Sequence, residues 1–373
     1  MKFYFLVFTL FNCLLISGQG VKSSTEHYNK AVEYFNSKNY ELAIASFSSS
    51  LVIDNTNSKA FFNRGNCAMY LKQYDNAIED FDKSISLDPQ FSKAYLNKGY
   101  TLLLKGDYLN SILMFNQAIN IDPDLGKAYV NRGTAYMKNN NCEMAIIDFT
   151  AAIIKGEHSY TTFLNRAICK SKTNDIQGAL ADFNAASDLK PDQSVTSMEK
   201  SKIYLKLAQW NNAISELSLA IKKNPSDPDL YQYRGYAKLM VEDVNAAMND
   251  FNICLQINPN HQAALQNKAM TSFKLGKYDE AVIDYSNLLK TDSKNAELFV
   301  LRGTCYLEIK DYDKALADFT EAISSKKDFA EAYFNRANTY TKLLDMKKAC
   351  TDIKESAKLG YSPAKAHITN LCN

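Results

Sequence analysis

The sequence lacks a large excess of positive or negative charge. Its 373 residues include 43 Lys and Arg against 41 Asp and Glu, which gives a formal net charge of +2 at pH 7. Proteins that bind nucleic acids typically carry a strongly basic stripe or patch, because contacts with phosphates dominate their affinity. The balanced composition therefore argues against a nucleic-acid partner.

Residues suited to catalysis or metal binding are also scarce. The four histidines lie far apart in the chain, and none belongs to a His-Glu-x-x-His motif. No Gly-x-Ser-x-Gly motif, glycine-rich phosphate loop or Cys-x-x-Cys pair occurs either. We therefore predict no enzyme activity, no cofactor and no metal ion. The Asp and Glu residues are expected on outer helical faces, in contact with solvent.

Long apolar runs are absent after the first twenty residues. Lys2 is followed by an apolar run from Phe3 to Ile16 and then by the small and polar residues 17–20. This order is typical of a secretory signal peptide, and the run is short for a membrane span. We predict that residues 1–20 are a signal peptide, that the protein is secreted, and that no membrane span remains after removal. A retained anchor is the alternative interpretation.

What the sequence does contain is a 34-residue repeat that recurs ten times without insertion or deletion. Three columns define it: a small residue, a second small residue twelve positions later, and a bulky apolar residue four positions after that. The first column is Ala31, Gly65, Gly99, Gly133, Ala167, Ser201, Gly235, Ala269, Gly303 and Ala337. The third is Phe47, Phe81, Phe115, Phe149, Phe183, Leu217, Phe251, Tyr285, Phe319 and Ile353.

A unit of this length cannot bury its own apolar face, so neighbouring units must stack. We place ten repeats over residues 24–363 and a C-terminal cap over residues 364–373. The repeat boundaries are 24–57, 58–91, 92–125, 126–159, 160–193, 194–227, 228–261, 262–295, 296–329 and 330–363.

Repeat two shows the expected secondary structure. Apolar periodicity predicts helices over residues 60–72 and 76–87, with a turn at residues 73–75 between them. Pro89 ends the second helix, because proline restricts the residue before it and cannot continue a helix. Each unit is therefore a helix-turn-helix of two antiparallel helices.

The residues of repeat three resemble the tetratricopeptide repeat, column by column. The matching positions are Tyr95, Gly99, Tyr108, Phe115, Ala118 and Pro123. The resemblance implies an all-α, right-handed superhelical solenoid whose first helices line the concave face, and a role in binding proteins. Repeat six departs from the pattern with Ser197, Ser201 and Leu217. Repeat four lacks the proline and reads Gly156-Glu157-His158.

The cysteines divide into two groups. Cys67, Cys169 and Cys305 share a column with small apolar residues, so we expect them to be buried. Cys350 and Cys372 lie eleven residues either side of Tyr361. In an antiparallel hairpin turning there, both would lie about 16 Å from the turn and face each other. We predict a disulfide worth about 3 kcal/mol, and the alternative is two core thiols. Such terminal units resemble those of exported bacterial members of the family, which implies a periplasmic or cell-envelope location.

One polar column on the first helices indicates a binding surface. An amide carries both a donor and an acceptor, so a row of asparagines can bind a peptide backbone of any sequence. Similar asparagine rows hold extended peptides in long superhelical members of the family. The column is Asn29, Asn63, Asn97, Asn131 and Asn165, and the flanking candidates are Phe62, Asn66, Met69, Leu96, Tyr100, Lys127, Val130 and Met137. The alternative is that these asparagines bond neighbouring helices.

Chaperone-binding members of the family hold a terminal carboxylate with two Lys, two Asn and an Arg. Asn66, Asn97 and Lys127 match this set, whereas Phe62 and Asn131 stand where cations are needed. We therefore predict a non-enzymatic scaffold that binds an extended peptide or a partner protein along repeats one to five, without capture of a terminal carboxylate. The alternative is a structural or assembly factor of the cell envelope that uses its convex faces and ends.

Overall fold

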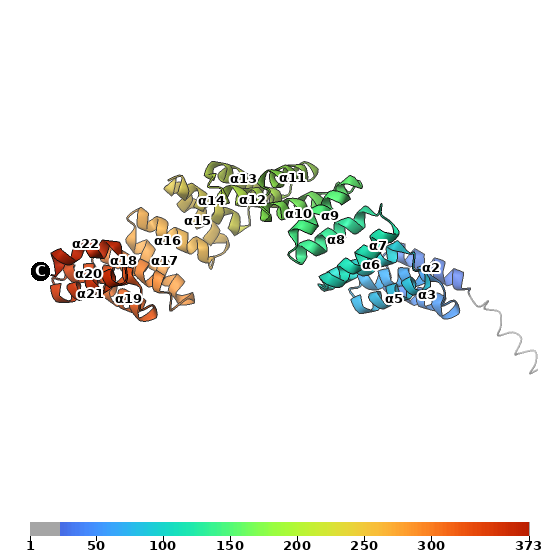
Figure 1. Cartoon of the computed structure of the whole chain (residues 1–373), viewed down its shortest axis with the longest axis horizontal. Helices are drawn as coiled ribbons and strands as arrows, with labels where there is room; N and C mark the ends of the chain where they lie inside the picture. Colours follow the sequence, from blue (N-terminus) through green and yellow to red (C-terminus); the bar gives the residue numbers. More distant parts are fainter. Residues whose placement is uncertain (1–22, 373) are drawn as a thin grey trace, which may run out of the picture. The chain divides into compact units, whose positions relative to one another are not determined.

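The computed structural model describes residues 23–372, which contain helices and no strands. The predicted signal peptide, residues 1–20, lies outside the described residues. No helix in the described part of the chain is both long enough and apolar enough to span a bilayer. The chain divides into two compact units after Lys190, which is inside the loop between repeats five and six (Figure 1).

Paired helices make up both units. The first unit contains α2(Ser24–Asn36), α3(Tyr40–Ile53), α4(Ser58–Tyr70), α5(Tyr74–Leu87), α6(Ser92–Lys105), α7(Tyr108–Ile121), α8(Gly126–Lys138), α9(Cys142–Ile154), α10(Tyr160–Lys172) and α11(Ile176–Leu189). The second contains α12(Ser194–Lys206), α13(Trp210–Lys223), α14(Pro228–Met240), α15(Val244–Ile257), α16(Gln262–Lys274), α17(Tyr278–Thr291), α18(Ala296–Glu308), α19(Tyr312–Ser325), α20(Ala330–Lys342), α21(Met346–Lys358) and α22(Ser362–Leu371).

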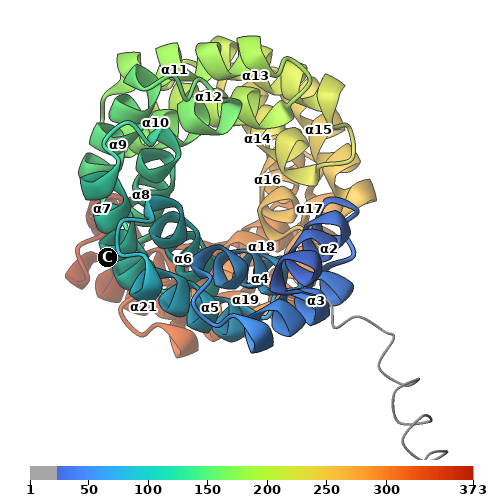
Figure 2. The same cartoon turned by 90° about the vertical axis from the view of Figure 1, so that its right-hand side faces the viewer.

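The helices follow the period of the sequence and confirm the predicted all-α repeat architecture. First helices begin every 34 residues, at Ser24, Ser58, Ser92 and onward, and second helices do so from Tyr40. Within the first unit, α4, α6, α8 and α10 follow the inner side of the curve, whereas α5, α7, α9 and α11 follow the outer side (Figure 2).

In the structure, the turn of repeat two lies two residues earlier than the sequence predicted. The helix α5 begins at Tyr74 rather than at Asn76, and α4 ends at Tyr70 rather than at Lys72. Lys72 takes a left-handed conformation with φ 60°, which closes the turn within three residues. The residue at this register is left-handed in every repeat, and only Gly106 and Gly276 are glycines there. Helical periodicity could not reveal this turn, because the left-handed residue is usually not glycine.

The core consists of the predicted columns. The apolar column from Phe47 to Ile353 is buried, and so are the small residues against it. At Gly99 a Cβ atom would come within 2.7 Å of the Phe115 ring, which is closer than van der Waals contact allows. The small residue is therefore required because the aromatic ring of the second helix packs directly on the backbone of the first.

Buried acidic residues overturn the expectation that Asp and Glu lie on solvated faces. Arg132 Nε and Nη2 donate to Asp148 Oδ2 and Oδ1 at 2.8 and 2.6 Å, and only 1% of the Asp148 side chain is exposed. Arg132 Nη1 also donates to Asn116 Oδ1, on the second helix of the preceding repeat, at 2.6 Å. One guanidinium thus joins three helices from two repeats, with the paired geometry that makes Arg–carboxylate bonds strong.

This arrangement recurs through both units and forms what we call the arginine ladder. In each case the arginine bonds an Asp 16 residues later and a Ser, Thr or Asn 16 residues earlier. Its members are Arg64, Arg132, Arg166, Arg234, Arg302 and Arg336. Lys268 and Lys200 pair with Asp284 and Glu216 at the same register. The acids are buried because a cation of the same repeat compensates their charge.

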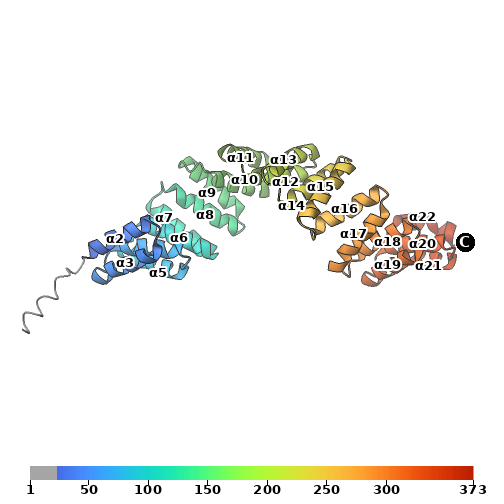
Figure 3. The ribbon, with the colours of Figure 1, turned by 180° about the vertical axis from the view of Figure 1, so that it is seen from behind.

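At the C-terminal end, α22 packs against the last hairpin (Figure 3). It begins at Ser362, two residues before the predicted cap, because Pro363 fits the first turn of a helix. Ala364 and Ile368 cover Ile353 and Ala337 of repeat ten. The Sγ atoms of Cys350 and Cys372 lie at disulfide-bond distance and join α21 to the end of α22. The cap therefore covers an apolar face that no further repeat covers among the described residues.

The remaining cysteines of the described chain are free and buried, as predicted for Cys67, Cys169 and Cys305. Burial raises the pKa of the Cys67 and Cys305 thiols to about 12. A thiol with so high a pKa stays protonated at neutral pH and is a poor nucleophile. These cysteines therefore serve as small core residues.

Candidate functional site

A pocket on the inner side of the first unit collects five of the eight predicted peptide-binding residues. These are Asn66, Asn97, Tyr100, Lys127 and Asn131, from α4, α6 and α8. We call it the groove pocket; its volume is about 400 Å³, and its other lining residues are Phe35, Met69, Tyr70, Leu96, Val130, Glu157 and Ser159. The sequence pattern predicted Met69, Leu96 and Val130 as flanking groups but missed Phe35, Tyr70, Glu157 and Ser159.

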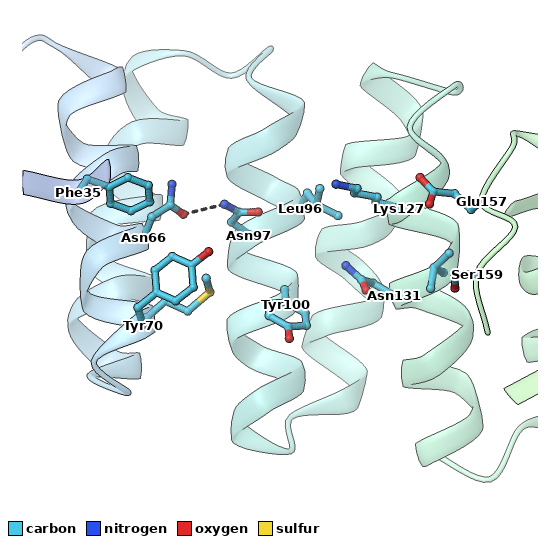
Figure 4. A pocket seen from close by; sticks show the side chains of 12 residues that line it. Phe35, Asn66, Tyr70, Leu96, Asn97, Tyr100, Lys127, Asn131, Glu157 and Ser159 are labelled. Carbon is cyan, nitrogen blue, oxygen red and sulfur yellow. Dashed lines mark hydrogen bonds between the residues drawn. The ribbon is translucent and has the colours of Figure 1, made fainter. Parts of the chain in front are cut away.

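The first helices bring these side chains together because each presents the same register to the inner side. Residues 34 apart stand on neighbouring helices, as Asn97 and Asn131 do, and Asn66 stands one turn along α4 from Asn63. In Figure 4, Phe35 and Tyr70 lie at one end of the pocket and Glu157 and Ser159 at the other. The pocket therefore has an aromatic end and a charged end.

The asparagines of the predicted row do not behave alike. Asn63 Nδ2 donates to the Tyr28 hydroxyl at 2.9 Å. At this position the alternative interpretation therefore applies, in which the asparagine bonds a neighbouring helix. Asn29 is exposed, and neither Asn29 nor Asn165 is among the residues that line the groove pocket. Asn97 and Asn131 do line it. The two members of the row that line the groove pocket thus lie in repeats three and four, and a peptide-binding role for the whole row stays a prediction.

Asn66 and Asn97 form a bonded pair across two helices. Asn97 Nδ2 donates to Asn66 Oδ1 at 2.7 Å, as the dashed line in Figure 4 shows. Each amide has one amino group and one carbonyl oxygen, so this bond leaves the Asn66 amino group and the Asn97 carbonyl for other partners. If both amide groups are rotated by 180°, the pair still leaves one hydrogen-bond donor and one acceptor for other partners. A peptide backbone needs such a donor and acceptor, and the Asn66–Asn97 pair holds them in place.

The aromatic end of the pocket is built from packed rings. Tyr70 stacks on Tyr40 with ring centroids 4.9 Å apart, and its centroid lies 6.0 Å from that of Phe35. Yet 55% of Tyr70 is exposed. An aromatic ring that is fixed on one side and open on the other can receive an apolar side chain at little cost in conformational entropy.

The charged end carries one cation and one anion. Lys127 at the start of α8 and Glu157 in the loop before α10 both line the groove pocket. Neither forms an ion pair with another residue between 23 and 372. Both also line an adjoining pocket of about 470 Å³, which extends past Leu96 and Asn97 to Phe62 and Asp122. Met137, the last flanking candidate, lines neither pocket.

The described residues offer no group of three or more His, Cys, Asp and Glu side chains placed to hold a metal ion. The groove pocket is lined by amides, apolar side chains, Lys127 and Glu157, and the adjoining pocket adds Lys93, Asp122 and Asp124; such groups can bind a polar ligand. Stacked helical hairpins with an open inner surface define a repeat scaffold for protein–protein interaction.

Comparison with known families identifies the repeat. Profiles of the tetratricopeptide repeat match residues 58–91, 81–112 and 267–331. The chain belongs to the tetratricopeptide-repeat family, whose members bind protein or peptide partners. No curated protein sequence matches the chain significantly.

One solved structure agrees with this fold at a TM-score above 0.5, and two others show weaker similarity. The C-terminal part of a TPR repeat-containing protein from Cytophaga hutchinsonii aligns with a TM-score of 0.59 and 15% identity, over 64% of this chain and 98% of that chain. YrrB, a TPR protein with an unusual peptide-binding site, aligns with a TM-score of 0.46 and 19% identity, over 50% of this chain and 97% of that chain. Yeast Tom70 aligns with a TM-score of 0.40 and 15% identity, over 93% of this chain and 94% of that chain.

Proposed function

We propose that the protein is an exported, non-enzymatic scaffold that holds an extended peptide, or an extended segment of a partner protein, in the groove pocket. The observation that carries this proposal is the Asn66–Asn97 pair, which keeps one donor and one acceptor available beside the exposed ring of Tyr70. Asn131, on α8, adds a third side-chain amide.

The magnitudes favour a complex in which the aromatic end of the pocket supplies most of the affinity. Each amide–backbone hydrogen bond contributes about 0.5–1.5 kcal/mol net, whereas a micromolar complex needs about 8 kcal/mol. Hydrogen bonds to the asparagines therefore position a backbone, and most of the affinity has to come from apolar contacts with Phe35, Met69 and Tyr70.

Peptide selection followed by titration tests this function. A library of random nine-residue peptides is selected on the full chain, and the enriched peptide is synthesised with a fluorophore and titrated by fluorescence polarisation. Asn97→Ala with Asn131→Ala should weaken its affinity about ten- to thirtyfold, because two hydrogen bonds are lost. Asn267→Ala with Asn335→Ala, at the same column of the second unit, is the matched control and should leave the affinity unchanged. Equal affinities for both double variants would overturn groove binding.

A second candidate function is that of a structural or assembly factor that uses its convex face. Leu113 and Ile147, on the second helices α7 and α9, are 54% and 58% exposed, and Leu109 is 66% exposed. Exposed apolar residues on neighbouring helices are typical of contact surfaces. If Leu113→Asp with Ile147→Asp removes binding of the selected peptide while the asparagine variant keeps it, the convex face is the binding surface.

Export to an oxidising compartment, the periplasm or cell envelope, is part of the proposal. It is supported by the charged, apolar and small-residue order of residues 1–20 and by the Cys350–Cys372 pair, since disulfides persist mainly outside the cytosol. Mass spectrometry of the protein purified from its own cells should find an N-terminal peptide that begins after residue 18 or 20. An intact N-terminus beginning at Met1 would contradict cleavage.

A further inference from the structure

The loop that departs from the repeat pattern supplies an acidic residue to the groove pocket. Repeats two, three and five end in Asp88-Pro89, Asp122-Pro123 and Lys190-Pro191, whereas repeat four has Gly156-Glu157 at this register. Gly156 adopts a left-handed φ of 89°, which most other residues would resist. Glu157 then lines both the groove pocket and the adjoining pocket.

A second local departure makes room for this side chain. The helix α8 begins at Gly126, where repeats two and three have Ser58 and Ser92. A Cβ atom at Gly126 would come within 2.6 Å of Glu157 Cγ, a contact that real Cβ atoms essentially never show. The Glu157 side chain therefore lies directly against the backbone of α8, at the charged end of the pocket.

The carboxylate of Glu157 is partly buried and has no ion-pair partner among residues 23–372. The nearby Lys155 is not available to it, because Lys155 Nζ bonds Asp124 Oδ1. Asp122 also lines the adjoining pocket, whereas the charge of Asp124 is already compensated by Lys155. A partly buried carboxylate that forms no ion pair favours a ligand that brings a cation to it.

We infer that Glu157 is a specificity-determining residue that selects peptides carrying a cationic group at the charged end of the groove pocket. This inference rests on the proposed function, because it concerns the same site. The cation is a Lys or Arg side chain or the amino terminus of the peptide. Lys127, at the same end, disfavours a cation placed directly over it, so the preference is confined to one position of the peptide.

Selection of the same nine-residue library on charge variants of the full chain tests the inference. The wild type should enrich Lys or Arg at one position, or peptides that bind only with a free amino terminus. Glu157→Gln should lose this enrichment while still selecting peptides, and Glu157→Lys should replace it by Asp or Glu. Glu143→Gln removes an exposed carboxylate of the same repeat outside both pockets and should select like the wild type.

Titration of synthetic peptides then identifies the cation. Replacing the selected Lys or Arg by norleucine, or acetylating the amino terminus, should weaken wild-type binding about five- to tenfold for whichever group is used. The same change should have no effect on Glu157→Gln. Gly126→Ala should weaken binding by a smaller factor, about two- to threefold, and only when Glu157 is present, because the added methyl group displaces that side chain.

The outcomes separate this inference from the proposed function. A wild-type chain that selects no peptide, or whose binding survives Asn97→Ala with Asn131→Ala, overturns both. A wild-type chain whose binding depends on the asparagines but which shows no cationic preference, or keeps that preference in Glu157→Gln, overturns the inference alone.

Discussion

The groove-facing column differs between the two units of the chain. Its five members in the first unit are all asparagine, whereas in the second unit the column reads Glu199, Tyr233, Asn267, Leu301 and Asn335. The arginine ladder, by contrast, runs through both units with the same bonds and the same separation of 16 residues. Columns that join the repeats to one another are therefore kept, and columns that face the groove vary.

This contrast separates residues that hold the helices together from residues that can vary without loss of the fold. A residue in the arginine ladder bonds three helices, so any change there affects two repeats at once. Leu301, in the variable column of the second unit, is 38% exposed, so its identity can change without loss of the fold. Asn63 and Asn97 nevertheless bond other residues of the scaffold, so part of the asparagine column contributes to the architecture.

Removal of a buried acid from the arginine ladder should have the largest effect, and a similar one in both units. Asp148→Ala leaves Arg132 partly buried without a counter-charge, and Asp250→Ala does the same to Arg234 and Lys238. Each should lower the free energy of unfolding by about 3–5 kcal/mol, measured by urea denaturation followed by circular dichroism.

The control for this prediction is Asp75→Ala, since Asp75 is 84% exposed and pairs with Lys105 at the surface, outside the register of the ladder. It should cost less than about 1 kcal/mol. If the Asp148 and Asp250 variants lose no more than this control, the ladder does not hold the repeats together.

The cap should give the next largest effect, and only in the second unit. Replacing Cys350 and Cys372 by Ser opens a loop with a sequence separation of 22 residues. This should lower the stability of the last repeat by about 2–3 kcal/mol, because the unfolded segment regains conformational entropy. Hydrogen exchange of α21 and α22 should accelerate, while exchange in α4 to α9 stays unchanged, since repeats contact only their neighbours.

Treatment of the wild-type protein with a reductant should reproduce the exchange pattern of the double variant. If both thiols of the untreated native protein react with an alkylating agent, the two cysteines are core thiols, which was the alternative interpretation of the sequence. In that case no disulfide would stabilise the end of the second unit, and this difference between the two units would disappear.

Much of the fold could be predicted because the residues that pack against each other recur at fixed positions of the repeat. A small residue opposite an aromatic one, as at Gly99 and Phe115, recurs every 34 residues and sets both helices of the hairpin. The position of the cap and the proximity of Cys350 and Cys372 followed from the same regular geometry. The burial of Asp148 did not, because a lone acid on a helix is typical of a solvated face until its partner 16 residues earlier is recognised.

The candidate site was harder to predict than the fold. The five asparagines look equivalent in the sequence, yet Asn63 bonds Tyr28 and Asn97 bonds Asn66. Phe35, Tyr70 and Glu157 had no pattern that marked them, except that Glu157 stands where repeat four lacks its proline. The repeat pattern therefore indicated most residues that line the groove pocket, and a departure from the repeat marked Glu157.

The amino-acid sequence was enough to establish the helical hairpins, their number, their register and their core, because short-range periodicity and the exclusion of side chains between close helices act within one or two repeats. The bonding partners of the polar side chains became known only from the folded chain. An asparagine can bond a neighbouring helix or face the groove, and an acid can be buried beside an arginine or left unpaired, as Glu157 is. The outcome depends on atoms that lie far apart in sequence but within a few ångströms in space. Hydrogen bonds and ion pairs are short-ranged and directional, so the sequence pattern could indicate their donors and acceptors but not their partners.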